Sequence, residues 1–380
     1  MADIIEILNN KPSALEKFGL YYLGFFKRNA TTDKVFDLTD AQLTGKVNFI
    51  TSTSILLSSI VGLVCVFVTV WINLYFTGSP FLIHYGWVIA VTIIATVIEF
   101  YLLFIIALRA VYLVSEIINM HARQSELITD GLFSVQHILS RTALELHDPE
   151  LKILGIDPFE RIAKKNLFIL SLLYKAKIVV SNFVLKYLLL LTVGPSIWGV
   201  SILYEALLVE CFWNGVVIRR VVHEARLRLF GFALANQLAN NVTSDKIIGK
   251  LSPLAKEGCM RAIGNAVVMS KNYHPNMIIL LLRFQKIVQI STANKYDDWL
   301  LFLETLKSVD EGERYFLLDL FTVAAAFDGK LSHREKANLK DVYGKDHCIY
   351  YPRLLQLSKH LKRGELNAAL DLCQLNFLPG

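Results

Sequence analysis

The side chains most able to carry chemistry are ionisable and amide groups that stand inside long apolar runs of this 380-residue chain. A charged side chain at the centre of a bilayer costs roughly 2.5–3.5 kcal/mol on insertion scales, so such a residue is expected to be paired or functional. The intramembrane candidates are Glu99, Lys175, Lys177, Asn182, Lys186, Glu205 and Glu210. Their types suit either a polar path for ions, protons, lipid or a small solute, or pairs that hold membrane helices together.

Lys186 and Glu205 form the clearest predicted ion pair. At the helical rise they lie about 10 Å and about 14 Å below the outer ends of two adjacent predicted spans, within reach of each other. Lys175, Asn182 and Lys186 share one helical face, because offsets of seven and eleven residues return near the same azimuth. Glu205 and Glu210 are five residues apart and do not share a face, which argues against a continuous polar path.

Motifs of familiar catalytic chemistry do not occur in the sequence. There is no G-x-S-x-G, no H-E-x-x-H and no glycine-rich phosphate loop. The five cysteines show no C-x-x-C pair, so we expect small buried thiols and not a zinc site or a disulfide framework. An EF-hand alignment places Gly329 at position six and Glu335 at position twelve, but Ala324 and Ala326 occupy the first and third positions. We therefore predict a non-enzymatic protein without cofactor or metal.

Two long apolar runs indicate an integral membrane protein. Residues 49–76 and 81–108 each exceed the ~20 residues that cross the hydrocarbon layer, and Thr77-Gly78-Ser79-Pro80 between them is a predicted turn. The region 166–220 is less apolar and is broken at Gly194-Pro195, which predicts a second hairpin. Small residues every four positions on one face predict close helix packing in the first span. These helix-packing residues are Ser54, Ser58 and Gly62.

Basic residues orient the spans. The predicted hairpin tips, 77–80 and 194–196, carry no charge. The segment between the hairpins is basic at Arg109, Arg123, Arg141, Lys152, Arg161, Lys164 and Lys165. The exit from the last span carries the membrane-surface basic residues Arg219, Arg220, Arg226 and Arg228. By the positive-inside rule, both termini and the connecting segment are predicted to be cytoplasmic.

The N-terminal region has an amphipathic pattern. Leu15, Phe18, Tyr22 and Phe25 recur at helical spacing beside basic residues, which suits a helix lying in the membrane interface. Packing of the same helix on the protein's own cytoplasmic part is the alternative.

Short amphipathic helices are expected from about Val221 onward. Ser252-Pro253, Ser308 with Glu311 and Ser332 with Glu335 are predicted helix starts. The apolar stretch 277–282 is too short to span a membrane and predicts a buried core helix. Residues from about Asn240 should form a separable soluble domain, and the second span should continue as a polar helix to about Leu144.

The overall composition agrees with a membrane protein. Hydrophobic residues make up 54% and charged residues 19% of the chain, and the mean hydropathy is +0.45. The net charge of +6 fits span orientation. No basic run with interleaved aromatic residues supports nucleic-acid binding.

Two resemblances add to this reading. The stretch from Phe316 to Leu320, with Ala324–Ser332 and Glu335, resembles the helix–turn–helix centre of TerB-like domains, which implies an all-helical module of the tellurite-resistance type. The segments 174–186, 213–217 and 224–228 are similar to a family of uncharacterised bacterial multi-span membrane proteins, which implies a membrane location.

The resulting hypothesis is an all-α protein with a four-span membrane part, in two hairpins, followed by a cytoplasmic TerB-like domain. The predicted divisions are 1–45 (interfacial), 46–110 (first hairpin), 111–165 (helical connector), 166–220 (second hairpin) and 221–380 (cytoplasmic domain, TerB-like around 308–345). We expect a bacterial inner-membrane protein that acts as a membrane-anchored interaction or envelope-stress module. The alternative is an ion or small-solute channel or transporter. The expected partners are the lipid bilayer, further copies of the chain and a cytoplasmic protein, with no nucleic acid.

Overall fold

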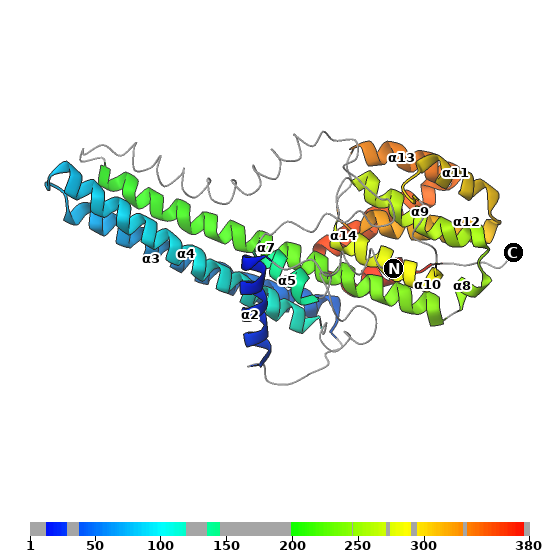
Figure 1. The fold of residues 1–380 in the computed structure, drawn as a ribbon, viewed down its shortest axis with the longest axis horizontal. Coiled ribbons are helices and arrows are strands. Elements are labelled where there is room, and N and C mark those ends of the chain that lie inside the picture. Colours follow the sequence, from blue (N-terminus) through cyan, green and yellow to red (C-terminus); the bar gives the residue numbers. More distant parts are fainter. Residues whose placement is uncertain are drawn as a thin grey trace. The chain divides into compact units, whose positions relative to one another are not determined.

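The computed structural model describes residues 13–28, 38–118, 135–144, 199–244, 246–270, 274–289, 295–329 and 333–375 (Figure 1). This part of the chain is 89% helical and contains no strand, which confirms the all-α class. It divides into two compact units. One consists of residues 1–48, 111–159 and 223–380, and the other of residues 49–110 and 160–222. Sequence analysis had placed its divisions after residues 45, 110, 165 and 220.

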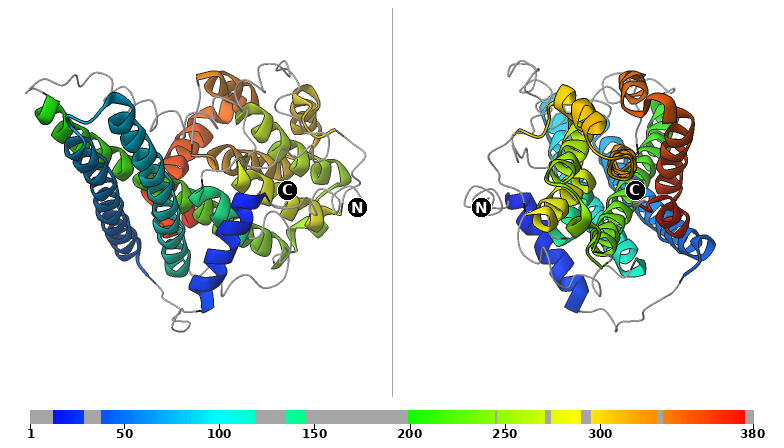
Figure 2. Two further views of the ribbon diagram at one scale, coloured as in Figure 1. Left: turned by 60° about the vertical axis from the view of Figure 1, so that its left-hand side comes forward. Right: turned by 90° about the vertical axis from the view of Figure 1, so that its right-hand side faces the viewer.

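The first predicted hairpin consists of α3 (Asp40–Tyr75) and α4 (Phe81–Ile117), joined by the expected turn (Figures 1 and 2). A capping box starts α3, because the Gln42 N–H donates to Thr39 Oγ1 and the Thr39 N–H donates to Gln42 Oε1. At the turn, His84 contacts the Phe76 carbonyl at 2.7 Å. Both helices are long and apolar enough to cross a membrane.

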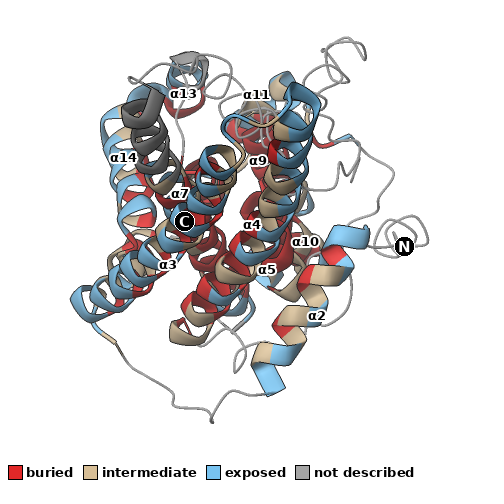
Figure 3. Ribbon diagram, turned by 90° about the vertical axis from the view of Figure 1, so that its left-hand side faces the viewer, coloured by how far each residue is buried: buried red, intermediate tan, exposed pale blue. Residues whose placement is uncertain are grey.

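Many large apolar residues on α3 and α4 are exposed (Figure 3). The exposed residues include Leu56, Phe67 and Trp71 on α3 and Ile94, Val97 and Tyr101 on α4. A water-soluble protein seldom exposes so continuous an apolar surface, whereas lipid covers one at no cost. Two observations therefore indicate that α3 and α4 cross a membrane: their length and hydropathy, and the exposure of their large apolar residues.

Helix α7 (Gly199–Ser244) covers the predicted fourth span and continues beyond it without a break. The expectation of short helices from Val221 is therefore wrong for residues 221–244. Leu229, Phe230 and Leu234 on this part of α7 are fully buried, so it is a core helix. A separable domain cannot begin near Asn240, because the cut would remove these side chains. The first part of α7 is not among the two candidate spans, and the predicted third span lies outside the described residues.

The remaining helices of the C-terminal region are α8 (Ile247–Lys250), α9 (Pro253–Ser270), α10 (Pro275–Val288), α11 (Trp299–Ser308), α12 (Glu311–Ala326), α13 (His333–Tyr343), the 3₁₀ turn η2 (Gly344–Asp346), α14 (His347–Arg363) and α15 (Leu366–Leu372). Helix α12 packs on α9 and α14, and α9 also contacts α10 and α11 (Figure 1). The predicted buried stretch 277–282 lies in α10, and all its residues but one are buried there.

Local capping residues start the helices of this region. Ser252 Oγ accepts the Ala255 N–H at 3.1 Å, which confirms the predicted start of α9. Helix α12 starts differently from the prediction. Ser308 ends α11, and Asp310 caps α12 by accepting the Glu313 N–H. Glu313 is buried and in turn accepts the Ser252 hydroxyl at 2.9 Å, so the starts of α9 and α12 are held together.

Two further helices lie before α7 in sequence. Helix α2 (Ala14–Arg28) packs on α5 (Val135–Ala143). The predicted continuation of the second span to Leu144 is wrong, since α4 ends at Ile117 and α5 is a separate, largely buried helix.

Candidate functional site

A buried polar contact among the described residues joins α4 to α7. Asn214 Nδ2 donates a hydrogen bond of 2.8 Å to Glu99 Oε1. Glu99 is 1% exposed and Asn214 is fully buried. An amide that donates to a buried carboxylate offsets part of the cost of removing that carboxylate from water. Asn214 Oδ1 has no hydrogen-bond partner among the described residues.

A seam of small and polar residues brings α7 against α3. Ser59 Oγ donates to the Cys211 carbonyl at 3.0 Å, and Cys211 Sγ donates back to the Ser59 carbonyl at 3.3 Å. One turn further along α7, a Cβ at Gly215 would lie 3.1 Å from Ile55. Such close backbone approach is how membrane helices associate where no hydrophobic drive exists. The contacts on α7 lie one turn apart, at positions 211, 214 and 215.

The structure places only some of the residues singled out by sequence. The predicted packing residues Ser54, Ser58 and Gly62 are all buried on α3. Glu99 lies in the polar contact just described. The side chains that lie outside the described residues are those of Lys175, Lys177, Asn182, Lys186, Glu205 and Glu210. The Lys186–Glu205 ion pair therefore stays a prediction.

Sequence reasoning missed Asn214 as the partner of Glu99. Asn214 follows an apolar stretch and precedes Gly215. Its uncharged amide is a weaker signal of an intramembrane site than a charged side chain is. The signal was present, because an amide in a membrane helix also needs a partner. The separation of 115 residues concealed which partner it has.

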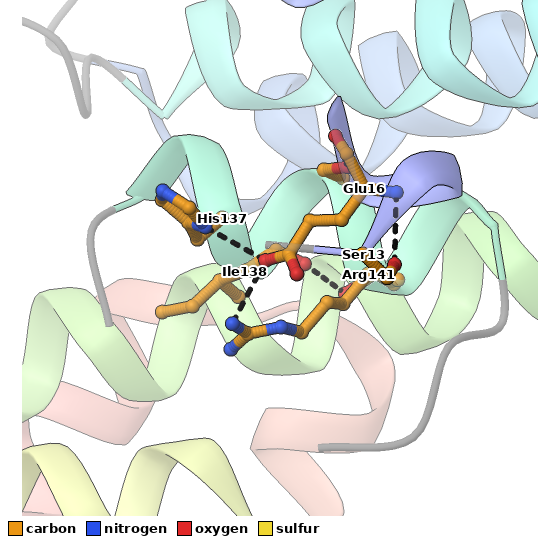
Figure 4. Close-up of polar contacts among 7 residues, drawn as sticks. Ser13, Glu16, His137, Ile138 and Arg141 are labelled. Atoms are coloured by element: carbon orange, nitrogen blue, oxygen red, sulfur yellow. Dashed lines mark hydrogen bonds and ion pairs between the residues drawn. The ribbon is translucent and has the colours of Figure 1, made fainter. Parts of the chain in front are cut away.

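A buried carboxylate fixes α2 to α5 (Figure 4). Glu16 lies 2.8 Å from Arg141 Nη2 and 2.7 Å from His137 Nδ1. Its side chain is 7% exposed and that of Arg141 is 4% exposed. Ser13 caps α2 by accepting the Glu16 N–H at 3.2 Å, and Ser140 Oγ donates to the Glu16 carbonyl at 3.2 Å. Sequence analysis assigned Arg141 only to the basic connector and gave Glu16 no role.

The basic residues at the end of the predicted fourth span fall into two groups. Arg219 and Arg220 are exposed. Arg228 is buried and pairs with Glu224 at 2.9 Å, so a place at the membrane surface does not fit it. Burial alone would raise the pKa of Glu224, but the neighbouring His274 ring and the Arg228 charge outweigh it and lower that pKa. Glu224 is therefore ionised at neutral pH.

Arg226, the fourth of these residues, caps the carbonyl end of α14. Its guanidinium donates to the Lys362 carbonyl in the last turn of α14. Helix α14 then ends at Gly364, which has a left-handed φ of +81°. The positive φ favours glycine at position 364, and a Cβ there, 2.8 Å from Arg226 Cδ, would also displace the Arg226 side chain.

The same turn is also attached to the start of α3. Asp40 accepts the backbone N–H groups of Asn367 and Ala368 at 2.9 and 3.0 Å, and thereby caps α15 from another helix. Asn367 Nδ2 donates to the Leu38 carbonyl at 3.2 Å. Residues at the start of α3 and in the second half of α7 therefore both bind the α14–α15 turn.

The partial EF-hand alignment over residues 324–335 does not correspond to a metal site among the described residues. Ala324 and Ala326 are buried in α12, and the Glu335 side chain lies outside the described residues. Within the described ranges no group of three or more His, Cys, Asp or Glu side chains is placed to hold a metal ion.

No family model matches the chain, and no curated protein or solved structure matches it either.

Proposed function

We propose that this chain is a multi-pass inner-membrane protein of bacterial type whose cytoplasmic helical region serves as a membrane-anchored interaction or envelope-stress module. The membrane part has four spans in two hairpins, with both termini in the cytoplasm. The C-terminal region is TerB-like around residues 308–345. The resemblances in the sequence and the uncharged hairpin tips support these finer assignments.

The observation that carries the proposal is the exposure of large apolar residues along α3 and α4. Lipid is the solvent that such a surface needs. Asp40 contacts α15 and Arg226 contacts α14, and all of these residues lie in the compact unit that contains the C-terminal helices.

A structural role for the intramembrane carboxylate favours an anchor over a channel. Glu99 is 1% exposed and accepts a hydrogen bond from Asn214, whereas a residue that lines a conducting path must meet water or the permeating ion. The channel or transporter hypothesis is therefore tested as the contrary outcome.

Membrane topology is tested by thiol labelling of intact cells. An impermeant maleimide should label Ser79→Cys at the first hairpin tip in a Cys348→Ser background. The native Cys348, which is exposed, should be labelled only after the membrane is permeabilised. Labelling of Cys348 in intact cells would overturn the cytoplasmic placement of the C-terminal region.

Function is tested by ion flux in liposomes that contain the purified protein. We expect no proton or potassium flux above that of empty liposomes, and no effect of Glu99→Gln. Flux that Glu99→Gln abolishes would replace the anchor by the channel.

A further inference from the structure

Helix α2 has one face turned toward the protein and another turned away from it. The inner face consists of Glu16, Gly19 and Leu23, which are buried. The outer face carries large side chains, since Tyr21 and Phe25 are 68% and 51% exposed. Helix α2 is therefore buried along one side and exposed along the other (Figure 3), where Tyr21 and Phe25 stay exposed.

The exposed ionic groups of α2 are all cationic. Glu16 is the only acidic residue of the helix, and it is turned inward toward Arg141. Lys17, Lys27 and Arg28 are exposed. Lys17 and Arg28 stand four residues before and seven residues after Tyr21, so they lie beside it on the same helical face. The outer surface of α2 thus combines aromatic rings with positive charge.

Ring contacts connect α2 to the end of the second apolar helix. Tyr22 contacts Phe26 with ring centroids 6.3 Å apart, and Phe26 contacts Tyr112 at 5.9 Å. Tyr112 follows Arg109 on α4 by three residues, about 4.5 Å along the helix. Arg109 is the first basic residue after the apolar run 81–108. Helix α2 therefore contacts α4 just past the end of the predicted second span.

We propose that the aromatic and basic face of α2, formed by Lys17, Tyr21, Phe25 and Arg28, binds the anionic headgroup region of the cytoplasmic leaflet. Tyrosine and phenylalanine side chains suit the boundary between headgroups and acyl chains. Lysine and arginine are attracted by the negative surface potential of that leaflet. The Glu16–Arg141 ion pair holds the opposite face of α2 on α5, so the helix is fixed between protein and lipid.

This inference rests on the proposed membrane location, and the experiment separates the two. Full-length protein with Cys348→Ser is labelled with an environment-sensitive fluorophore at Phe25→Cys and reconstituted with nitroxide-labelled lipids. The vesicles contain phosphatidylcholine alone or with phosphatidylglycerol. Tyr21→Cys is a second probe on the same face. Leu300→Cys is the control outside α2, because this residue is 70% exposed on α11 of the proposed cytoplasmic region.

We expect the lipids to quench the probe at position 25 several-fold more than the probe at position 300, most strongly with phosphatidylglycerol. Replacing both Lys17 and Arg28 by glutamine should weaken the anionic-lipid preference by about fivefold for each cation removed. Added salt should weaken it as well.

A reporter at Leu56→Cys, which is 62% exposed on α3, tests the membrane location itself. If position 56 is quenched but positions 21 and 25 are not, the lipid-binding face is refuted and the proposed location stands. If position 56 is not quenched either, the location fails. Disulfide cross-linking between Phe25→Cys copies without quenching would show that the face binds a second copy of the chain, which also overturns the inference.

Discussion

The two glycines of α2 allow a matched test of how this helix is docked. A Cβ at Gly19 would overlap Ser140 Oγ and lie 3.0 Å from Ser140 Cβ and 3.1 Å from Leu144 Cδ1. A Cβ at Gly24 would meet no atom within 4 Å. Both residues lie inside α2 and neither has a positive φ. Gly→Ala is therefore the same chemical change in the same helix at a closed and at an open position.

The two substitutions should act with opposite sign. Alanine is favoured over glycine inside a helix by up to about 1 kcal/mol, and at position 24 nothing opposes this gain. At position 19, overpacking costs about 1–3 kcal/mol. Rotating Ser140 Oγ away would also break its bond to the Glu16 carbonyl, a loss of about 0.5–1.5 kcal/mol. After the helix-propensity gain is subtracted, Gly19→Ala should weaken the docking of α2 by about 1–3 kcal/mol.

Hydrogen exchange of the full-length protein in lipid nanodiscs measures this docking locally. Amide exchange in α2 and α5 should be about 5- to 150-fold faster in Gly19→Ala and unchanged or slower in Gly24→Ala. Exchange in α9 and α12 serves as the internal reference and should not change in either variant. Equal exchange in the two variants would refute the close approach of α2 to Ser140.

Three further predictions concern the membrane helices and the thiols. Asn214→Leu should lower the stability against SDS unfolding in mixed micelles by about 0.6–1.7 kcal/mol, the range for polar contacts between membrane helices; no loss would mean that this amide does not support its carboxylate partner. Lys186→Met and Glu205→Gln should each destabilise the protein in the same assay, and the double variant should recover much of the loss if the two side chains pair; losses that simply add would exclude the pair. Cys348 should react with maleimide near pH 9, whereas Cys373, whose pKa burial raises from 9.0 to about 12, should stay protonated and unreactive in the folded protein. Because the folded pKa of Cys373 is the higher one, its burial stabilises the fold below about pH 9 and loses that effect as the pH rises toward 12, so rapid alkylation of both thiols at pH 9 would contradict the buried site.

Local sequence signals predicted several elements correctly. Long apolar runs without Lys or Arg predicted α3 and α4, and the turn residues between them predicted where one helix ends and the next begins. Ser252 predicted the start of α9. These signals are reliable because capping, turn formation and hydropathy depend on residues a few positions apart. Two candidate caps, Ser308 and Asp310, precede α12. The sequence analysis predicted Ser308 as the cap, whereas the structure uses Asp310.

Contacts between distant residues were decided only by the tertiary structure. In the sequence Glu16 is an ordinary polar residue of an amphipathic helix, and its burial depends on His137 and Arg141, more than 100 positions away. The same holds for the attachment of Asp40 to α15 and for the pairing of Glu99 with Asn214. The local sequence likewise does not predict that α7 continues through residue 221. Its second half is stabilised as a helix by the burial of its apolar side chains in the core. A residue's side-chain type fixes what it costs to bury. Which neighbours offset that cost depends on how segments distant in the sequence pack together, and local sequence patterns do not show this packing.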